Sequence, residues 1–159
     1  MNKIFEDVRG LYVSHIGRAA DMLCINIGPN VAKNCKGDDL SQFDIHVQCP
    51  WRIIDTACGR ILIASADMYC EAKNDGIITE NQSVFDQQVK MEFNNRKLRV
   101  LELTVLDTKD LMIRFSDGLK FETFVNQSIP EENWRFFRRD ENHVHIISIG
   151  TCLIEESET

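Results

Sequence analysis

Apolar and polar residues alternate along several short segments of this chain, and a period of two residues is typical of half-buried β-strands. The segment 43–55 shows the strongest alternation. Pro50 lies inside it and has no backbone N–H to donate, which indicates a β-bulge or an edge position there. The alternation predicts about eight strands, at residues 11–19, 22–28, 43–55, 60–66, 101–105, 111–115, 119–125 and 143–150.

Turn residues connect the strands in the second half of the chain. Ser116-Asp117-Gly118 is typical of a tight hairpin turn. The flanking segments 111–115 and 119–125 are therefore expected to pair, and 101–105 is expected to join them in a three-stranded meander. Because βαβ alternation is missing from the pattern, the sheet is expected to be mostly antiparallel.

Helical spacing and capping patterns predict two or three short helices. Residues 3–9 carry a helical stripe that ends at Gly10. Ser83 followed by Asp86 resembles a capping box and predicts a helix over residues 84–93, although residues 89–93 also alternate as a strand would.

A third helix is predicted near residue 130. Ser128 with Glu131 resembles a second capping box, and Pro130 occupies the expected first helical position. This helix is expected to carry three aromatic residues, Trp134, Phe136 and Phe137.

The remaining segments are predicted to lack regular structure. Residues 31–42 resemble a surface loop, 67–82 an excursion, and 155–159 a frayed tail. The predicted fold class is therefore α+β: a twisted, mostly antiparallel sheet of about eight strands with two or three short helices, in one domain over residues 1–159.

Composition and charge narrow the classes of function. The 159 residues are 43% hydrophobic and 27% charged, with a net charge of −7. This charge argues against a nucleic-acid partner or an anionic membrane, both of which need a basic face. An acidic surface of this kind is first of all typical of a soluble protein, and its second interpretation is the binding of a basic protein partner.

The N-terminus and the hydropathy pattern predict a cytoplasmic protein. Glu6 and Asp7 interrupt what would be the apolar part of a signal peptide. No apolar run approaches the roughly 18–20 residues that a membrane span requires.

Familiar catalytic motifs are missing from the sequence, so an enzyme is the less favoured expectation. The glycine loops for phosphates, the G-x-S-x-G elbow and the H-E-x-x-H pair do not occur. The six cysteines have no C-x-x-C spacing, and we expect neither a metal nor a cofactor.

Two pairs of residues that contain a histidine could act as a catalytic pair or as metal ligands. His46 could hold the thiol of Cys49 as a thiolate, but positions three apart on a strand face opposite ways, so a buried structural cysteine is favoured. His143 and His145 could share one face of a strand and bind a metal, although such histidines more often pack over a sheet or face water.

A polar group on the 43–55 segment is the candidate ligand-binding site. His46, Gln48 and Arg52 share one side of this segment, and Arg18 is expected on a neighbouring strand. Together they could present donors to a carboxylate or phosphate. The alternative, which we favour, is that Arg18 and Arg52 pair internally with carboxylates such as those of Asp21, Asp55 or Asp67.

The run His46-Val47-Gln48-Cys49-Pro50-Trp51-Arg52-Ile53 resembles the signature of a family of small uncharacterised bacterial proteins without an established activity. The segments 17–22 and 134–135 fall where those proteins carry similar residues. Some small acidic bacterial proteins of this kind resemble immunity proteins, which bind and neutralise a toxin. The resemblance thus implies a protein partner.

These observations lead to two functional hypotheses. The first is a non-enzymatic binding protein, with an immunity protein as one case, that engages a basic protein or toxin through an acidic surface. The second is a small-molecule-binding protein or enzyme that uses the polar face around His46, Gln48 and Arg52. The oligomeric state is left open.

Overall fold

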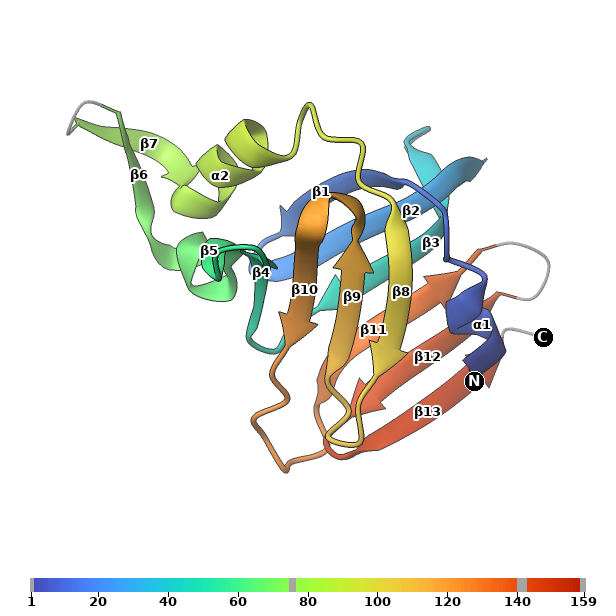
Figure 1. Ribbon diagram of the computed structural model, residues 1–159. Coiled ribbons are helices and arrows are strands. Elements are labelled where there is room, and N and C mark those ends of the chain that lie inside the picture. Colours follow the sequence, from blue (N-terminus) through green and yellow to red (C-terminus); the bar gives the residue numbers. More distant parts are fainter. Residues whose placement is uncertain (1, 75–76, 140–142, 158–159) are drawn as a thin grey trace.

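The computed structural model describes residues 2–74, 77–139 and 143–157. Its strands form two large antiparallel sheets that pack face to face (Figure 1). The six-stranded sheet has the order β1 (Val13–Ala19), β2 (Met22–Lys33), β3 (Asp39–Val47), β11 (Glu132–Arg138), β12 (Val144–Ile149) and β13 (Cys152–Ser157). The five-stranded sheet has the order β5 (Arg60–Ala64), β4 (Trp51–Asp55), β10 (Leu119–Thr123), β9 (Leu111–Phe115) and β8 (Val100–Val105).

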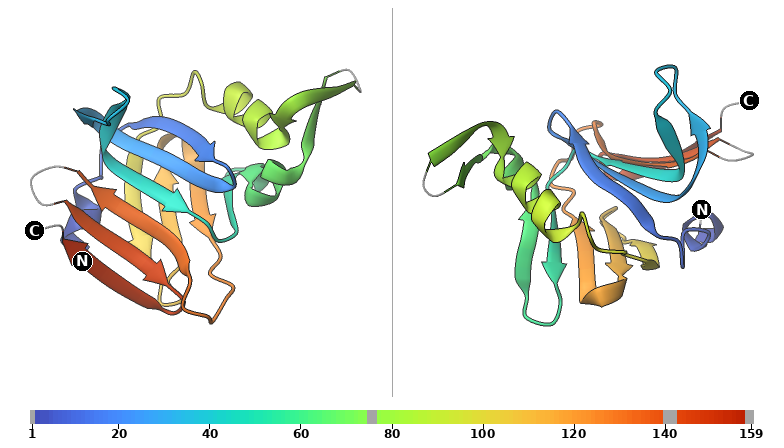
Figure 2. Two further views of the ribbon diagram at one scale, coloured as in Figure 1. Left: turned by 180° about the vertical axis from the view of Figure 1, so that it is seen from behind. Right: turned by 90° about the horizontal axis from the view of Figure 1, so that it is seen from above.

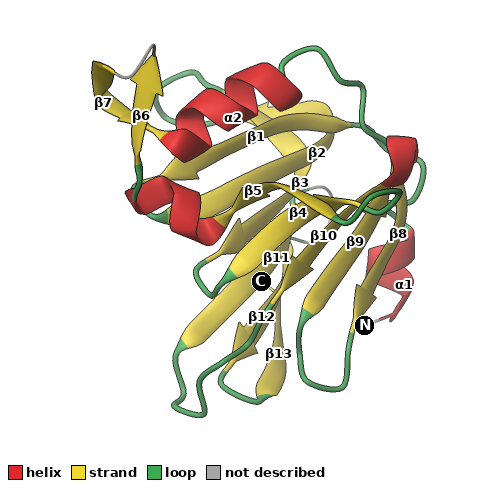
Figure 3. Cartoon of the chain, turned by 60° about the vertical axis from the view of Figure 1, so that its left-hand side comes forward, coloured by secondary structure: helices red, strands yellow, loops and turns green. Residues whose placement is uncertain are grey.

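Short helices and a hairpin lie at the periphery of the two sheets (Figures 2 and 3). The helices are α1 (Asn2–Glu6) and α2 (Val84–Glu92), with 3₁₀ turns η1 (Ser65–Tyr69) and η2 (Ser116–Gly118). The hairpin of β6 (Glu71–Asn74) and β7 (Ile77–Ser83) projects from the body beside α2 (Figure 2). In the described part of the chain, no helix is long and apolar enough to cross a membrane.

The predicted fold class is wrong. The described residues are 56% strand and 14% helix, so the fold is mostly β rather than α+β, and no eight-stranded sheet forms. The single large sheet does not form because the chain passes from one sheet to the other at Pro50. The segment 43–55 is not one strand: its first part ends β3 in one sheet, and its second part is β4 in the other.

The crossover between the sheets is held by backbone hydrogen bonds. The amides of Gln48 and Cys49 both donate to the carbonyl of Asn133, at 2.8 and 3.1 Å. The carbonyl of Pro50 then accepts from the amide of Phe124 at 2.8 Å. Since proline has no N–H, the six-stranded ladder stops here and the chain passes to the opposite layer.

Three further segments correct the expectations from sequence. Residues 132–138 form β11 rather than a helix, because Trp134 and Phe136 alternate into the core and this pairing outweighs the capping pattern. The region predicted as a loop over 31–42 instead extends β2 and β3. Most of the predicted frayed tail belongs to β13, with residues 158–159 outside the described part of the chain.

Other expectations are confirmed. All strand pairings in the described residues are antiparallel, and β8, β9 and β10 form the expected meander. α2 begins at the predicted capping box, where the Ser83 hydroxyl accepts from the amide of Asp86 at 3.2 Å. α1 is shorter than the predicted 3–9 helix, and the predicted 67–82 excursion contains η1 and the β6–β7 hairpin, with 75–76 outside the described residues.

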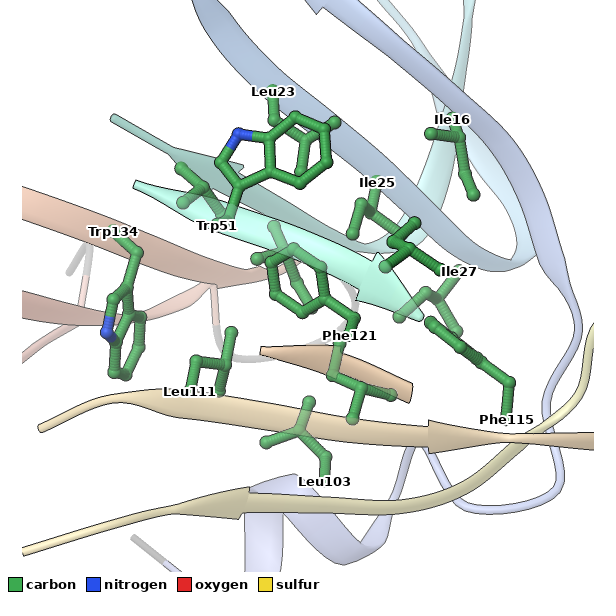
Figure 4. Close-up of a cluster of buried hydrophobic side chains, with 14 of the residues drawn as sticks. Ile16, Leu23, Ile25, Ile27, Trp51, Leu103, Leu111, Phe115, Phe121 and Trp134 are labelled. Atoms are coloured by element: carbon green, nitrogen blue, oxygen red, sulfur yellow. The ribbon is translucent and has the colours of Figure 1, made fainter. Parts of the chain in front are cut away.

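The inner faces of both sheets form one hydrophobic core (Figure 4). Ile25 and Trp134 come from the six-stranded sheet, and Phe121 and Leu111 from the five-stranded sheet. The indole Nε1 of Trp134 donates to the carbonyl of Lys109 at 2.8 Å, which ties β11 to the turn between β8 and β9. Phe5 of α1 packs edge-on against Phe136, with ring centroids 5.3 Å apart, and so closes part of the open side of the sandwich.

Candidate functional site

The four residues of the predicted polar site do not come together. His46 points outward from the six-stranded sheet, because its neighbours Ile45 and Val47 are buried. Arg52 points outward from the five-stranded sheet on the opposite side of the sandwich, because Trp51 and Ile53 are buried.

Gln48 is exposed in the crossover, and Arg18 lies on β1 against α2. The guanidinium of Arg18 binds Asp86 through two hydrogen bonds, Nε to Oδ1 at 2.9 Å and Nη2 to Oδ2 at 2.8 Å. The same carboxylate accepts from the amide and hydroxyl of Ser83. The guanidinium of Arg18, together with the Ser83 donors, holds the pKa of Asp86 well below its usual range. Arg18 is thus paired internally, with a carboxylate outside the set expected from sequence.

Arg52 is also paired internally. Its Nε donates to Glu122 Oε1 at 2.7 Å, and its guanidinium lies 5.0 Å from the ring centroid of Phe124. Lys120 binds the other oxygen of Glu122 at 2.7 Å. Burial alone would raise the pKa of Glu122, but its hydrogen bonds to Lys120 and Arg52 outweigh it and lower the pKa. This network bridges β4 and β10 on the outer face of the five-stranded sheet.

His46 belongs to an aromatic row on the outer face of the six-stranded sheet. Its ring and that of His145 each lie 4.6 Å from the ring of Phe137, on opposite neighbouring strands. Burial is the main cause that lowers the pKa of His46. Beside this row, the buried Asp44 forms an ion pair with Arg139. These contacts pack the outer face of the sheet, and the guanidinium of Arg139 is already bound to the carboxylate of Asp44.

The structure gives the His46–Cys49 pair no catalytic geometry. Cys49 is buried on the core side, and burial raises the pKa of its thiol to about 11. A thiol with that pKa is protonated at neutral pH and is a poor nucleophile. Among the described residues, no three His, Cys, Asp or Glu side chains cluster closely enough to hold a metal ion.

A feature that sequence reasoning missed is the outer edge of β8. The two sheets have four outer edges. β5 packs against α2 and η1, β1 packs in part against α2, and β13 exposes Glu155 and Glu156. Charged or covered edges are protected from pairing with other chains. β8 packs in part against α1 and continues as Leu101-Glu102-Leu103-Thr104-Val105-Leu106, with Leu101 41% and Leu106 44% exposed.

Among the described residues, the backbone of β8 has no strand partner beside residues 101–105, on the side away from β9. Leu106 donates its amide to Asp110 on the β9 side at 2.9 Å. Because successive residues of a strand direct their backbone groups to opposite sides, Val105 and Leu103 direct theirs away from β9. In the part of the chain that the structure describes, β8 has no strand partner on that side between residues 101 and 105.

A groove of about 950 Å³ runs along this open edge. β8 forms one side, α1 and the following turn contribute Phe5, Glu6, Arg9 and Gly10, and β13 contributes Leu153. Leu103, which is 8% exposed, and Leu153 give it apolar surface. The apolar composition of residues 101–106 is the signal in the sequence, but the sequence does not say that this strand lies at an edge.

Residues 98–100, at the start of the same edge, are already paired with residues 10–13 of the N-terminal segment. Gly10 donates to the Val100 carbonyl and Val100 to the Leu11 carbonyl, both at 2.8 Å, and Val13 donates to the Leu98 carbonyl at 2.9 Å. An antiparallel bridge joins Tyr12 and Arg99. At Gly10, whose φ of 85° favours glycine, the chain turns away from β8. The edge thus accepts a strand up to Val100 and, among the described residues, has no strand partner beyond it, with α1 packed beside it.

Comparison with known proteins finds no matching family model, curated protein or solved structure.

Proposed function

We propose that this chain is a non-enzymatic binding protein that docks an extended segment of a protein partner along the open edge of β8. The observation that carries the proposal is the edge of β8 beside the groove, which has no strand partner among the described residues over 101–105 and exposes Leu101 and Leu106. An extended peptide gains affinity there from main-chain hydrogen bonds and specificity from alternate side chains that enter the groove.

The charge of the whole chain adds to this proposal. A net charge of −7 attracts a basic protein at long range and raises the rate of encounter at low salt. The resemblance of residues 46–53 to a family of small bacterial proteins points, by analogy with immunity proteins, to a toxin as one class of partner. The alternative of a ligand site made from Arg18, His46, Gln48 and Arg52 receives no geometric support, since the four lie apart and both arginines are paired.

Proline substitution provides the test. In Val105→Pro the lost N–H is one that faces away from β9, so the sheet should survive while strand addition is blocked. In the matched control Thr104→Pro, the lost N–H faces β9, and the ladder itself should weaken. We expect Val105→Pro to abolish the binding of extended peptides selected on the wild-type protein, with an unchanged circular dichroism spectrum. A folded Val105→Pro variant that binds those peptides as wild type does would contradict the proposal.

A further inference from the structure

The side chains that line the groove carry one more cation than carboxylates, on a chain whose net charge is −7. The side chains that line it include four cations, Arg9, Arg99, Lys109 and Arg114, against three carboxylates, Glu6, Glu102 and Asp107. Arg114 is bound to Glu102 at 3.2 Å and is therefore neutralised locally. Arg9 and Arg99 lie where the N-terminal segment leaves β8, with Glu6 three residues before Arg9.

Both arginines lie at that end of the β8 edge. Arg9 precedes Gly10, which is hydrogen-bonded to Val100, and no ion pair of the Arg9 side chain occurs among the described residues. Arg99 donates to the hydroxyl of Tyr12 at 2.7 Å and lies 5.0 Å from the centroid of its ring. A phenol leaves the charge of the guanidinium uncompensated, and this hydrogen bond lowers the pKa of Tyr12.

The direction of an added strand determines which of its ends meets these arginines. The N-terminal segment pairs with β8 in the antiparallel sense, as do all the neighbours in this sheet. An incoming strand that continues this line is antiparallel too, so it begins beside Val105 and ends beside Leu101. Its C-terminal end therefore lies next to Arg9 and Arg99.

We infer that the segment docked on β8 is an extended apolar strand that carries a carboxylate at its C-terminal end, bound by Arg9 and Arg99. This inference rests on the proposed strand addition. Arginine binds carboxylates well because its planar guanidinium offers several donors. The carboxylate is either an acidic side chain or the C-terminus of the partner, since both present the same chemistry.

Defined peptides distinguish these sources. The probe is a fluorescein-labelled peptide with three Thr-Val repeats followed by Glu-Glu and a C-terminal amide. The first comparison peptide ends in Gln-Gln with an amide, and the second in Gln-Gln with a free carboxylate. Binding is measured by fluorescence anisotropy at low ionic strength to wild type, Arg9→Gln, Arg99→Gln and Val105→Pro.

The inference predicts that the Glu-Glu peptide binds about tenfold more tightly than the Gln-Gln amide. Arg9→Gln and Arg99→Gln should each remove most of this preference while leaving the affinity for the Gln-Gln amide unchanged. Val105→Pro should abolish the binding of every peptide. Tight binding of the Gln-Gln free acid as well would identify a C-terminal carboxylate as an accepted anchor.

The contrary outcomes separate the inference from the proposed function. If all peptides bind equally and Val105→Pro abolishes this binding, strand addition stands and the carboxylate anchor is refuted. If no peptide binds, or if folded Val105→Pro binds as wild type does, both are refuted. If wild type forms a dimer that Val105→Pro dissociates, the occupant of the edge is a second copy of the chain, and the carboxylate-bearing partner is refuted.

A second measurement covers the case in which Val105→Pro does not fold. Bound peptide should slow amide hydrogen exchange at Leu103 and Val105 in the wild-type protein, because strand addition pairs these two amides. Peptide binding without this change would overturn the inference.

Discussion

Trp134→Phe tests whether the two sheets are tied together as the structure shows. Trp134 is fully buried, and its Nε1 donates to the carbonyl of Lys109 in the turn between β8 and β9. Phenylalanine keeps an aromatic ring but removes this hydrogen bond, at a cost of about 0.5–1.5 kcal/mol. The smaller ring also leaves a void in a close-packed core, at a cost on the order of 1–2 kcal/mol.

The expected loss in the free energy of unfolding is therefore about 1.5–3.5 kcal/mol, a large fraction of the roughly 5–15 kcal/mol of a typical domain. For a chain of this size it corresponds to a fall in Tm of roughly 3–14 °C. Urea unfolding followed by far-ultraviolet circular dichroism measures it without relying on tryptophan fluorescence. Ile61→Ala, at a site that is 52% exposed, is the control and should change stability by less than about 0.5 kcal/mol. A loss for Trp134→Phe as small as that of the control would refute the described packing.

Three further predictions follow from the other sites. Arg18 lowers the pKa of Asp86 in the folded chain, so Asp86 stabilises the fold above the unfolded carboxyl pKa of about 3.9, and this stabilisation is lost as pH falls. Asp86→Asn should therefore lower the free energy of unfolding by roughly 1–2 kcal/mol at pH 7, and urea titrations should show that the variant loses less stability than wild type on acidification. Cys49, with a pKa of about 11, should resist iodoacetamide at pH 8 while the exposed cysteines react, as peptide mass mapping would show; rapid labelling of Cys49 in the folded protein would contradict its burial. Arg52→Ala should lower the unfolding free energy by only about 0.5–1 kcal/mol, because its ion pair with Glu122 is partly exposed. Because this pair lies outside the groove, peptide binding should stay unchanged, and impaired peptide binding would contradict this.

The parts of the fold that local chemistry determines could be predicted from the sequence. The turn at 116–118 gives the β9–β10 hairpin, and the capping box at Ser83 gives the start of α2. In both cases the signal and the structure lie within a few residues of each other.

The parts that depend on long-range pairing could not be predicted in this way. Residues 132–138 carry a capping pattern, but β3 and β12 on either side of them supply strand partners. The alternation over 43–55 is continuous across Pro50, and a period of two residues does not say which sheet each half joins. Missing this crossover placed His46 and Arg52 on one face when they lie on opposite sides of the sandwich.

The candidate site in the groove was missed for the same reason. An edge strand differs from a central strand only in having one neighbour instead of two, and neighbours are set by the tertiary fold. Leu101 and Leu106 look like ordinary strand residues in the sequence, and only the pairing of the two sheets shows that this edge is open.

Amide hydrogen exchange along β8 tests the central claim most directly. Free protein should show fast exchange at Leu103 and Val105, which face away from β9, and slow exchange at Glu102 and Thr104, which face it. Addition of the Glu-Glu peptide should slow Leu103 and Val105 selectively. Uniform protection along β8 before any peptide is added, or no change at Leu103 and Val105 at saturating peptide, would contradict docking by strand addition.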